Sequence, residues 1–194
     1  MKQKIYLQLE DGSIYEGYSF GAPLLHHVIA EVVFTTAMTG YVETLTDPSY
    51  YGQMVVQTFP LIGNYGVCLE DMESDKLYPA ALLVHELCDT PSNFRCEMTL
   101  EELLIKYGIP CVTGLDNRAI VMNVRENGAM KAIITDDISD KDALLNKIKS
   151  GEAYYDFIEV MACEGGCITG PATYSGDKGK RMMVQNLAKW KNTY

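Results

Sequence analysis

The chain has 194 residues, 47% of them hydrophobic and 22% charged, and a formal net charge of −10 at pH 7. This composition is ordinary for a globular protein, and the negative charge argues against nucleic acid or an anionic membrane as the main partner. No run approaches the roughly 20 apolar residues of a membrane span, and the N-terminus lacks the apolar stretch of a signal peptide, so we expect a cytoplasmic protein without a membrane partner.

The first half of the sequence predicts β-strands. Two stretches of alternating polarity flank Asp11 and Gly12, a pair typical of a hairpin turn. The apolar run at 79–87 is nearly continuous, which predicts one strand buried on both faces. The predicted strands of this half are 5–9, 14–18, 28–34, 53–59 and 79–87.

A polar run, TAMTGYVETLTDPSYYG at 36–52, separates two of these strands and is expected to be a long functional loop. Its aromatic and branched residues argue against disorder. Hydroxyl groups both donate and accept hydrogen bonds, so they suit an uncharged polar ligand. The alternative is a turn without a ligand, in which the Asp47 carboxylate accepts from a backbone amide two residues on. The polar candidates are Thr36, Thr39, Thr44, Thr46, Asp47, Ser49, Tyr41, Tyr50 and Tyr51.

Helical signals follow in the second half. Thr99 and Glu102 have the spacing of a capping box, and Gly108 closes the short helix that it opens. A second helix is predicted over 116–126, with Ile120 and Val124 facing inward. Ser139 and Asp142 predict another capping box, for a helix that ends at Lys149. The remaining predictions are a turn at 92–95 with Arg95 available for an ion pair, strands at 111–115, 131–135 and 156–162, a glycine loop at 163–171 and a basic helix at 179–190.

Strands that precede helices indicate a mixed α/β fold. Adjacent His26 and His27 point to opposite faces of an extended chain, so with Glu31 they are interpreted as surface residues rather than metal ligands. His85 and Glu86 receive the same interpretation. A nucleophilic cysteine elbow with a downstream histidine is not found, so a self-contained hydrolase is not expected.

The cysteines differ in their spacing. Cys163 and Cys167 form a C-x-x-x-C pair in a glycine loop, which supplies half of a zinc or iron–sulfur site. With no second cysteine pair, we expect no metal and no cofactor. The other four are interpreted as small core hydrophobes: Cys68, Cys88, Cys96 and Cys111.

Residues 5–138 resemble the N-terminal domain of the small subunit of glutamine-hydrolysing carbamoyl-phosphate synthase. The resemblance is carried by MTGYVETLTDPSY, by ESDKLYPAALLVHELCDTPSNFR and by GLDNRAIVMNVRENGAMKAIIT. It implies an α/β domain of the swivelling β/β/α type, which packs on an amidotransferase domain and on the large synthetase subunit as partner. In that family a cysteine–histidine–glutamate triad hydrolyses glutamine, and ammonia passes to the large subunit for arginine and pyrimidine biosynthesis.

The same resemblance implies site residues at four positions. Ser49 would contact the glutamine bound by the amidotransferase domain, and Ala37, Met38 and Asp47 would line the start of the ammonia path. The chain departs from the family pattern at Thr35, where asparagine is usual, and at DNRAIVM, where DTRxLTR is usual. Because the amidotransferase domain and its triad are missing from the sequence, no catalytic residue is expected and the chain alone should be inactive.

Residues 144–190 resemble the end of iron-only hydrogenases, in which a MACxGGC motif supplies two cluster cysteines. The other cluster motifs of that family are absent. We therefore predict two parts, a small-subunit domain at 1–148 and a hydrogenase-like appendage at 149–194. A change in charge falls near this boundary: residues 1–138 carry 19 acidic and 8 basic residues, and residues 139–194 carry 7 and 8. An iron–sulfur fragment and an inactive truncated fusion stay open as alternatives.

Overall fold

The computed structural model describes residues 3–150 of the chain. The strand, glycine loop and basic helix predicted between 156 and 190 lie outside these residues, as do Cys163 and Cys167. No helix within 3–150 combines the length and apolar character needed to cross a membrane.

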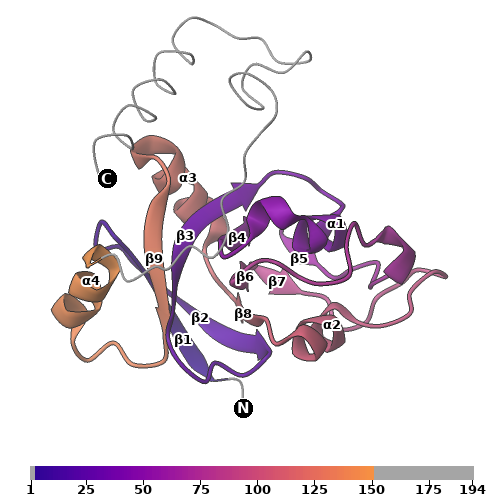
Figure 1. Cartoon of the computed structure of the whole chain (residues 1–194), viewed down its shortest axis with the longest axis horizontal. Coiled ribbons are helices and arrows are strands. Elements are labelled where there is room, and N and C mark those ends of the chain that lie inside the picture. The colour runs from indigo at the N-terminus through magenta and orange to yellow at the C-terminus, as the bar shows by residue number, and fades with distance from the viewer. Residues whose placement is uncertain (1–2, 151–194) are drawn as a thin grey trace, which may run out of the picture. The chain divides into compact units, whose positions relative to one another are not determined.

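Seven strands close into a barrel with the order β1-β2-β8-β6-β4-β3-β9, which confirms a mixed α/β fold (Figure 1). The barrel strands are β1 (Lys4–Leu9), β2 (Ile14–Gly21), β3 (Val28–Thr35), β4 (Met54–Gln57), β6 (Ala81–Leu83), β8 (Pro110–Thr113) and β9 (Met130–Thr135). A separate two-stranded sheet pairs β5 (Leu61–Ile62) with β7 (Glu86–Leu87). The helices are α1 (Tyr41–Thr46), α2 (Leu100–Tyr107), α3 (Asn117–Asn127) and α4 (Lys141–Lys149), with 3-10 turns η1 (Pro48–Tyr50) and η2 (Leu69–Asp71).

The barrel is part antiparallel and part parallel. The predicted hairpin is confirmed, because β1 and β2 pair antiparallel with Ile5 opposite Gly17. Strands β3, β4, β6 and β8 run parallel to one another. Closure comes from β9, which pairs antiparallel with both β1 and β3. The carboxyl ends of the four parallel strands therefore lie at one end of the barrel, where β3 leads into α1.

Three clusters of buried side chains hold these elements together. The barrel interior is filled from β1 by Ile5, Leu7 and Leu9, and α3 packs against it through Ile120 and Val124, as predicted. A second cluster joins α1 and α2 to β2, β6 and β8 through Phe20, Leu82 and Cys111. The third places α4 against β9, away from α1 and α2 (Figure 1).

The single strand predicted over 79–87 is wrong in its extent. Ala81–Leu83 form β6 and are fully buried, as expected for a strand covered on both faces. Beyond it the chain changes partner: Glu86 N donates to Pro60 O, so Glu86–Leu87 form β7 beside β5. His85 lies exposed between the two short strands.

One of the two predicted capping boxes is confirmed. Thr99 and Glu102 bond reciprocally at the start of α2. At α4 the N-cap is Asp140, whose carboxylate accepts from Ala143 N at 2.9 Å, so the prediction of Ser139 was wrong. Ser139 belongs to the preceding turn, in which its backbone N donates to the Asp137 carboxylate at 2.9 Å.

The four described cysteines are thiols rather than disulfides. Cys68 and Cys111 are buried, in agreement with their interpretation as core hydrophobes, and burial raises the pKa of the Cys111 thiol well above its usual value. Cys88 and Cys96 are only half-buried, so the interpretation was wrong for this pair.

Candidate functional site

The polar run at 36–52 is not a loop throughout, because its middle forms α1 and its end forms η1. The buried residues of α1 are Tyr41, Val42, Leu45 and Thr46. Their spacing places them on one side of the helix, against the cluster that α1 shares with α2. Six residues are too few for this periodicity to stand out among threonines, which is why the prediction of a loop was wrong.

The start of α1 is capped from outside the segment. Gly40 adopts the left-handed conformation, with φ 84°, and has no side chain to cap the helix. The Tyr65 hydroxyl takes that role by accepting from Gly40 N at 2.7 Å and from Tyr41 N at 3.3 Å. The Tyr65 ring stacks on Tyr41, with 4.3 Å between ring centroids. Tyr65 therefore fixes the position of α1, although the sequence did not suggest it.

The hydroxyl groups of both stacked tyrosines are protonated and uncharged in the fold. Burial raises the pKa of the Tyr41 hydroxyl far above its ordinary value, and this hydroxyl donates to Gly66 O. Burial also raises the pKa of Tyr65, although the two backbone donors at α1 act in the opposite direction. Neither hydroxyl is therefore a nucleophile at neutral pH, and their role is to hold α1 against the turn at 63–66.

The end of α1 is fixed by two side chains of its own segment. Thr46 Oγ1 donates to Val42 O at 2.9 Å and accepts from Glu73 N at 3.0 Å. The Asp47 carboxylate accepts from Ser49 N at 2.8 Å, which is the Asx turn anticipated from the sequence. Ser49 itself is exposed, so its hydroxyl is presented on a backbone that Asp47 holds in place.

The four residues expected to form a site lie at the two ends of α1. Ala37 and Met38 precede the helix, and both are exposed, Met38 by 70%. Asp47 and Ser49 follow it and contact one another. A helix of six residues rises about 9 Å, so the two pairs share one segment without the structure bringing them into contact.

Other polar residues weighed from the sequence have structural partners. The carboxylate of Glu31 in β3 accepts at 2.9 Å from Nε2 of Gln53, the residue before β4. His85 Nδ1 lies 2.8 Å from Leu115 O. His26 and His27 are both exposed. Within residues 3–150 no three His, Cys, Asp or Glu side chains are grouped closely enough to hold a metal ion.

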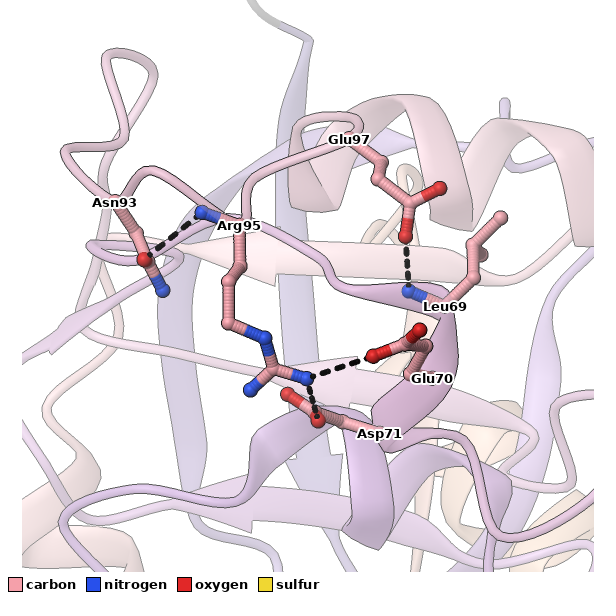
Figure 2. A network of polar contacts seen from close by, with 6 residues as sticks. All are labelled: Leu69, Glu70, Asp71, Asn93, Arg95 and Glu97. Atoms are coloured by element: carbon pink, nitrogen blue, oxygen red, sulfur yellow. Dashed lines mark hydrogen bonds and ion pairs between the residues drawn. The ribbon is translucent and has the colours of Figure 1, made fainter.

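A polar network joins η2 to the turn at 92–95 (Figure 2). Arg95 forms an ion pair with Asp71 at 2.8 Å and a longer one with Glu70 at 3.4 Å, which confirms the expected ion pair. The predicted turn is also confirmed, because Asn93 Oδ1 accepts from Arg95 N at 3.1 Å. This network holds a loop next to the turn that positions α1.

Taken together, these features define the described part of the chain as an α/β barrel domain with a polar segment around α1. Its exposed side chains include the Ser49 hydroxyl and the Met38 thioether, whereas the Asp47 carboxylate is half-buried.

Comparison with known proteins identifies the family. The family model described as "Carbamoyl-phosphate synthase small chain, CPSase domain" matches residues 7–134, and the chain belongs to this family. The carbamoyl phosphate synthase small chain of Desulfovibrio desulfuricans is 52% identical over 147 residues, 76% of this chain and 39% of that protein. Those of Lawsonia intracellularis and Staphylococcus haemolyticus are 50% and 44% identical, over 75% and 84% of this chain. The chain spans 38% and 44% of the length of these two relatives.

Two further comparisons are weaker. The model "Iron only hydrogenase large subunit, C-terminal domain" matches residues 99–171, less than half of the chain. Its first part overlaps the carbamoyl-phosphate synthase match, over α2, β8, α3 and β9, which are elements of the barrel domain. A solved aminopeptidase from Aneurinibacillus sp. strain AM-1 aligns with 70% of this chain and 32% of its own, at a TM-score of 0.39 and 14% identity, which is too low to inform fold or function.

Proposed function

We propose that this chain acts as the N-terminal domain of the small subunit of glutamine-dependent carbamoyl-phosphate synthase. In this role it docks to the large subunit and supplies one wall of the glutamine site and of the ammonia channel. The observation that carries the proposal is the family match over residues 7–134, which includes the whole surface around α1. The exposed hydroxyl and apolar side chains of that surface suit a wall shared with a second domain.

The proposal extends to the architecture. The barrel domain is of the swivelling β/β/α type and comprises residues 1–148, and residues 149–194 are a separate hydrogenase-like appendage. Ile148 of α4 belongs to one of the three buried clusters, so α4 is part of the barrel domain. The glutaminase is supplied by another polypeptide or domain, so the isolated chain is inactive towards glutamine.

Within this proposal Ser49 contacts glutamine and Asp47 has two tasks. Ser49 is exposed, and its hydroxyl can hydrogen-bond a neutral amide without adding charge. Asp47 holds the Ser49 backbone through one carboxylate oxygen, which leaves acceptor capacity for ammonia on the channel side. Ala37 and Met38 line the channel at the other end of α1, where small or apolar side chains do not retain ammonia.

The test measures the KM for glutamine of a chimeric small chain assembled with the matching large subunit. In the chimera, residues 1–148 precede the amidotransferase part of the Desulfovibrio desulfuricans small chain. We expect Ser49→Ala to raise the KM for glutamine about 2- to 10-fold, the loss of roughly one hydrogen bond, with little change when ammonia replaces glutamine. Ser139→Ala, an exposed serine before α4, is the matched control. An unchanged KM for glutamine in the Ser49 variant would show that this residue has no part in the site.

A further inference from the structure

The most exposed large hydrophobic residue in the described part of the chain is Phe94, at 97%. The next are Leu25 at 79% and Met38 at 70%. Phe94 lies in the loop 88–98 between β7 and α2, which we call the Phe94 loop. It is far along the sequence from α1, and the site proposed above makes no use of it.

The backbone on both sides of Phe94 is held by short-range bonds. Asn93 Oδ1 accepts from Arg95 N at 3.1 Å, and Asn93 O accepts from Cys96 N at 3.1 Å, so 93–96 form a tight turn with Phe94 at its tip. Ser92 N donates to Asn64 O at 2.9 Å, which ties the loop to the turn at 63–66.

Longer-range contacts fix the same turn to η2, as Figure 2 shows. The Arg95 guanidinium lies 2.8 Å from the Asp71 carboxylate and 3.4 Å from that of Glu70. The Glu97 carboxylate accepts from Leu69 N at 2.8 Å. The side chains of Asn93, Arg95 and Glu97 thus form bonds within the protein, while the Phe94 ring is exposed to solvent. An aromatic side chain on a pre-ordered loop loses little further entropy on binding, which is typical of an interface anchor.

The charge around the Phe94 loop indicates the kind of surface that would cover it. Residues 67–102 carry nine acidic residues and two basic ones, and the basic Arg95 is already paired with acidic side chains. A complementary surface would present an apolar pocket with lysine or arginine at its rim. A second copy of this chain, with a net charge of −10, would bring like charges together and is disfavoured.

We infer that Phe94 is the anchor with which this domain docks to the large subunit, by insertion into an apolar pocket with a basic rim. The inference rests on the proposed function and deepens it, because it assigns the docking contact to one loop. The Phe94 loop is a different segment from α1, so docking and glutamine contact belong to different residues.

The experiment measures binding of the full 194-residue chain to the large subunit that partners the Desulfovibrio desulfuricans small chain, by biolayer interferometry. We expect Phe94→Ala to weaken Kd roughly 10- to 100-fold, as for an interface hot spot, and Phe94→Trp to retain binding. Leu25→Ala, which removes another exposed apolar side chain, should change Kd by less than about 2-fold. Raising the salt from about 0.05 to about 0.5 M should weaken binding of the unmodified chain.

The outcomes separate this inference from the proposed function. Binding of the unmodified chain with an unchanged Kd for Phe94→Ala would overturn the role of Phe94 and leave docking intact. Absence of binding by the unmodified chain would overturn both. A homodimer that Phe94→Ala abolishes, seen by analytical ultracentrifugation, would assign the residue to a self-interface and overturn the inference. Because the ring is exposed, all variants should keep the unfolding midpoint of the unmodified chain.

Discussion

Tyr65 is the residue on which the position of α1 most depends. Its hydroxyl caps the two backbone N–H groups at Gly40 and Tyr41, where the helix has no cap of its own. We expect Tyr65→Phe to lower the free energy of unfolding by about 1 kcal/mol, because it leaves these donors without their partner while keeping the ring stacked on Tyr41. Urea unfolding followed by far-UV circular dichroism measures this difference.

A matched tyrosine tests whether the effect comes from the cap. The Tyr107 hydroxyl donates one bond of 3.2 Å to Asp75 O in an exposed setting, and its loss in Tyr107→Phe should cost much less. If the two variants were equally stable, the cap at α1 would contribute nothing beyond an ordinary surface hydrogen bond.

At the residue scale, sequence reasoning succeeded where partners are close along the chain. The Asx turn of Asp47 and Ser49 spans two residues, so its residue types alone predict it. The Tyr65 cap joins residues 25 positions apart, so no local pattern of residue types predicts it. The roles assigned to Ser49, Ala37, Met38 and Asp47 came from family resemblance, and they stay predictions.

At the scale of secondary-structure elements, the contribution of the α2 capping box to stability can be measured. Thr99 Oγ1 accepts from Glu102 N at 3.2 Å, and the Glu102 carboxylate accepts from Thr99 N at 2.7 Å. We expect Thr99→Ala to destabilise the domain by about 1 kcal/mol in urea unfolding, because the Glu102 N–H at the start of α2 loses its acceptor. Ser92→Ala, at an exposed serine in the preceding loop, should have no measurable effect.

The same cap has a pH dependence with a defined sign. The backbone N–H and the hydroxyl of Thr99 lower the pKa of Glu102 below its usual value. A lowered folded-state pKa stabilises the fold above the unfolded-state value of about 4.3 and ceases to do so as the pH falls through the folded-state value. The stability difference between the unmodified chain and Glu102→Gln should therefore be larger at neutral pH than in acid; a constant difference would mean that the charge is irrelevant.

Helices and strands were predicted correctly where several sequence signals fall within one short segment. Helix α3 was found from its inward Ile120 and Val124 and from the stop at Asn127 and Gly128, all within one segment. The break between β6 and β7 was missed because Leu87 was interpreted as continuing the apolar run past the polar His85 and Glu86, whereas the strand partners change there, from β4 and β8 to β5. Partner choice depends on segments distant in sequence, and hydrophobic periodicity does not record it.

At the scale of the whole molecule, we predict that the barrel domain folds without the residues that follow it. All seven strands of the closed barrel lie between Lys4 and Thr135, so a fragment of residues 1–150 should fold by itself. We expect one cooperative urea transition, with coincident signals from tyrosine fluorescence and far-UV circular dichroism. A fragment without a cooperative transition would place the boundary further towards the C-terminus.

Sequence reasoning gave the fold class but not the barrel. Alternating and continuous apolar runs predicted most of its strands, yet closure requires β1 to pair with β9, with Tyr6 opposite Thr135. Nothing in either segment specifies the other beyond a shared apolar face, so the closed topology is known from the structure alone.

The pairing of β1 with β9 also constrains the protein while it is being made. The hairpin of β1 and β2 leaves the ribosome before β9, so one edge of β1 has no partner until residue 135 has been synthesised. Until then a nascent chain exposes an apolar strand edge that can pair with neighbouring chains. The N-terminal hairpin is therefore the segment where chaperone binding during translation would matter most.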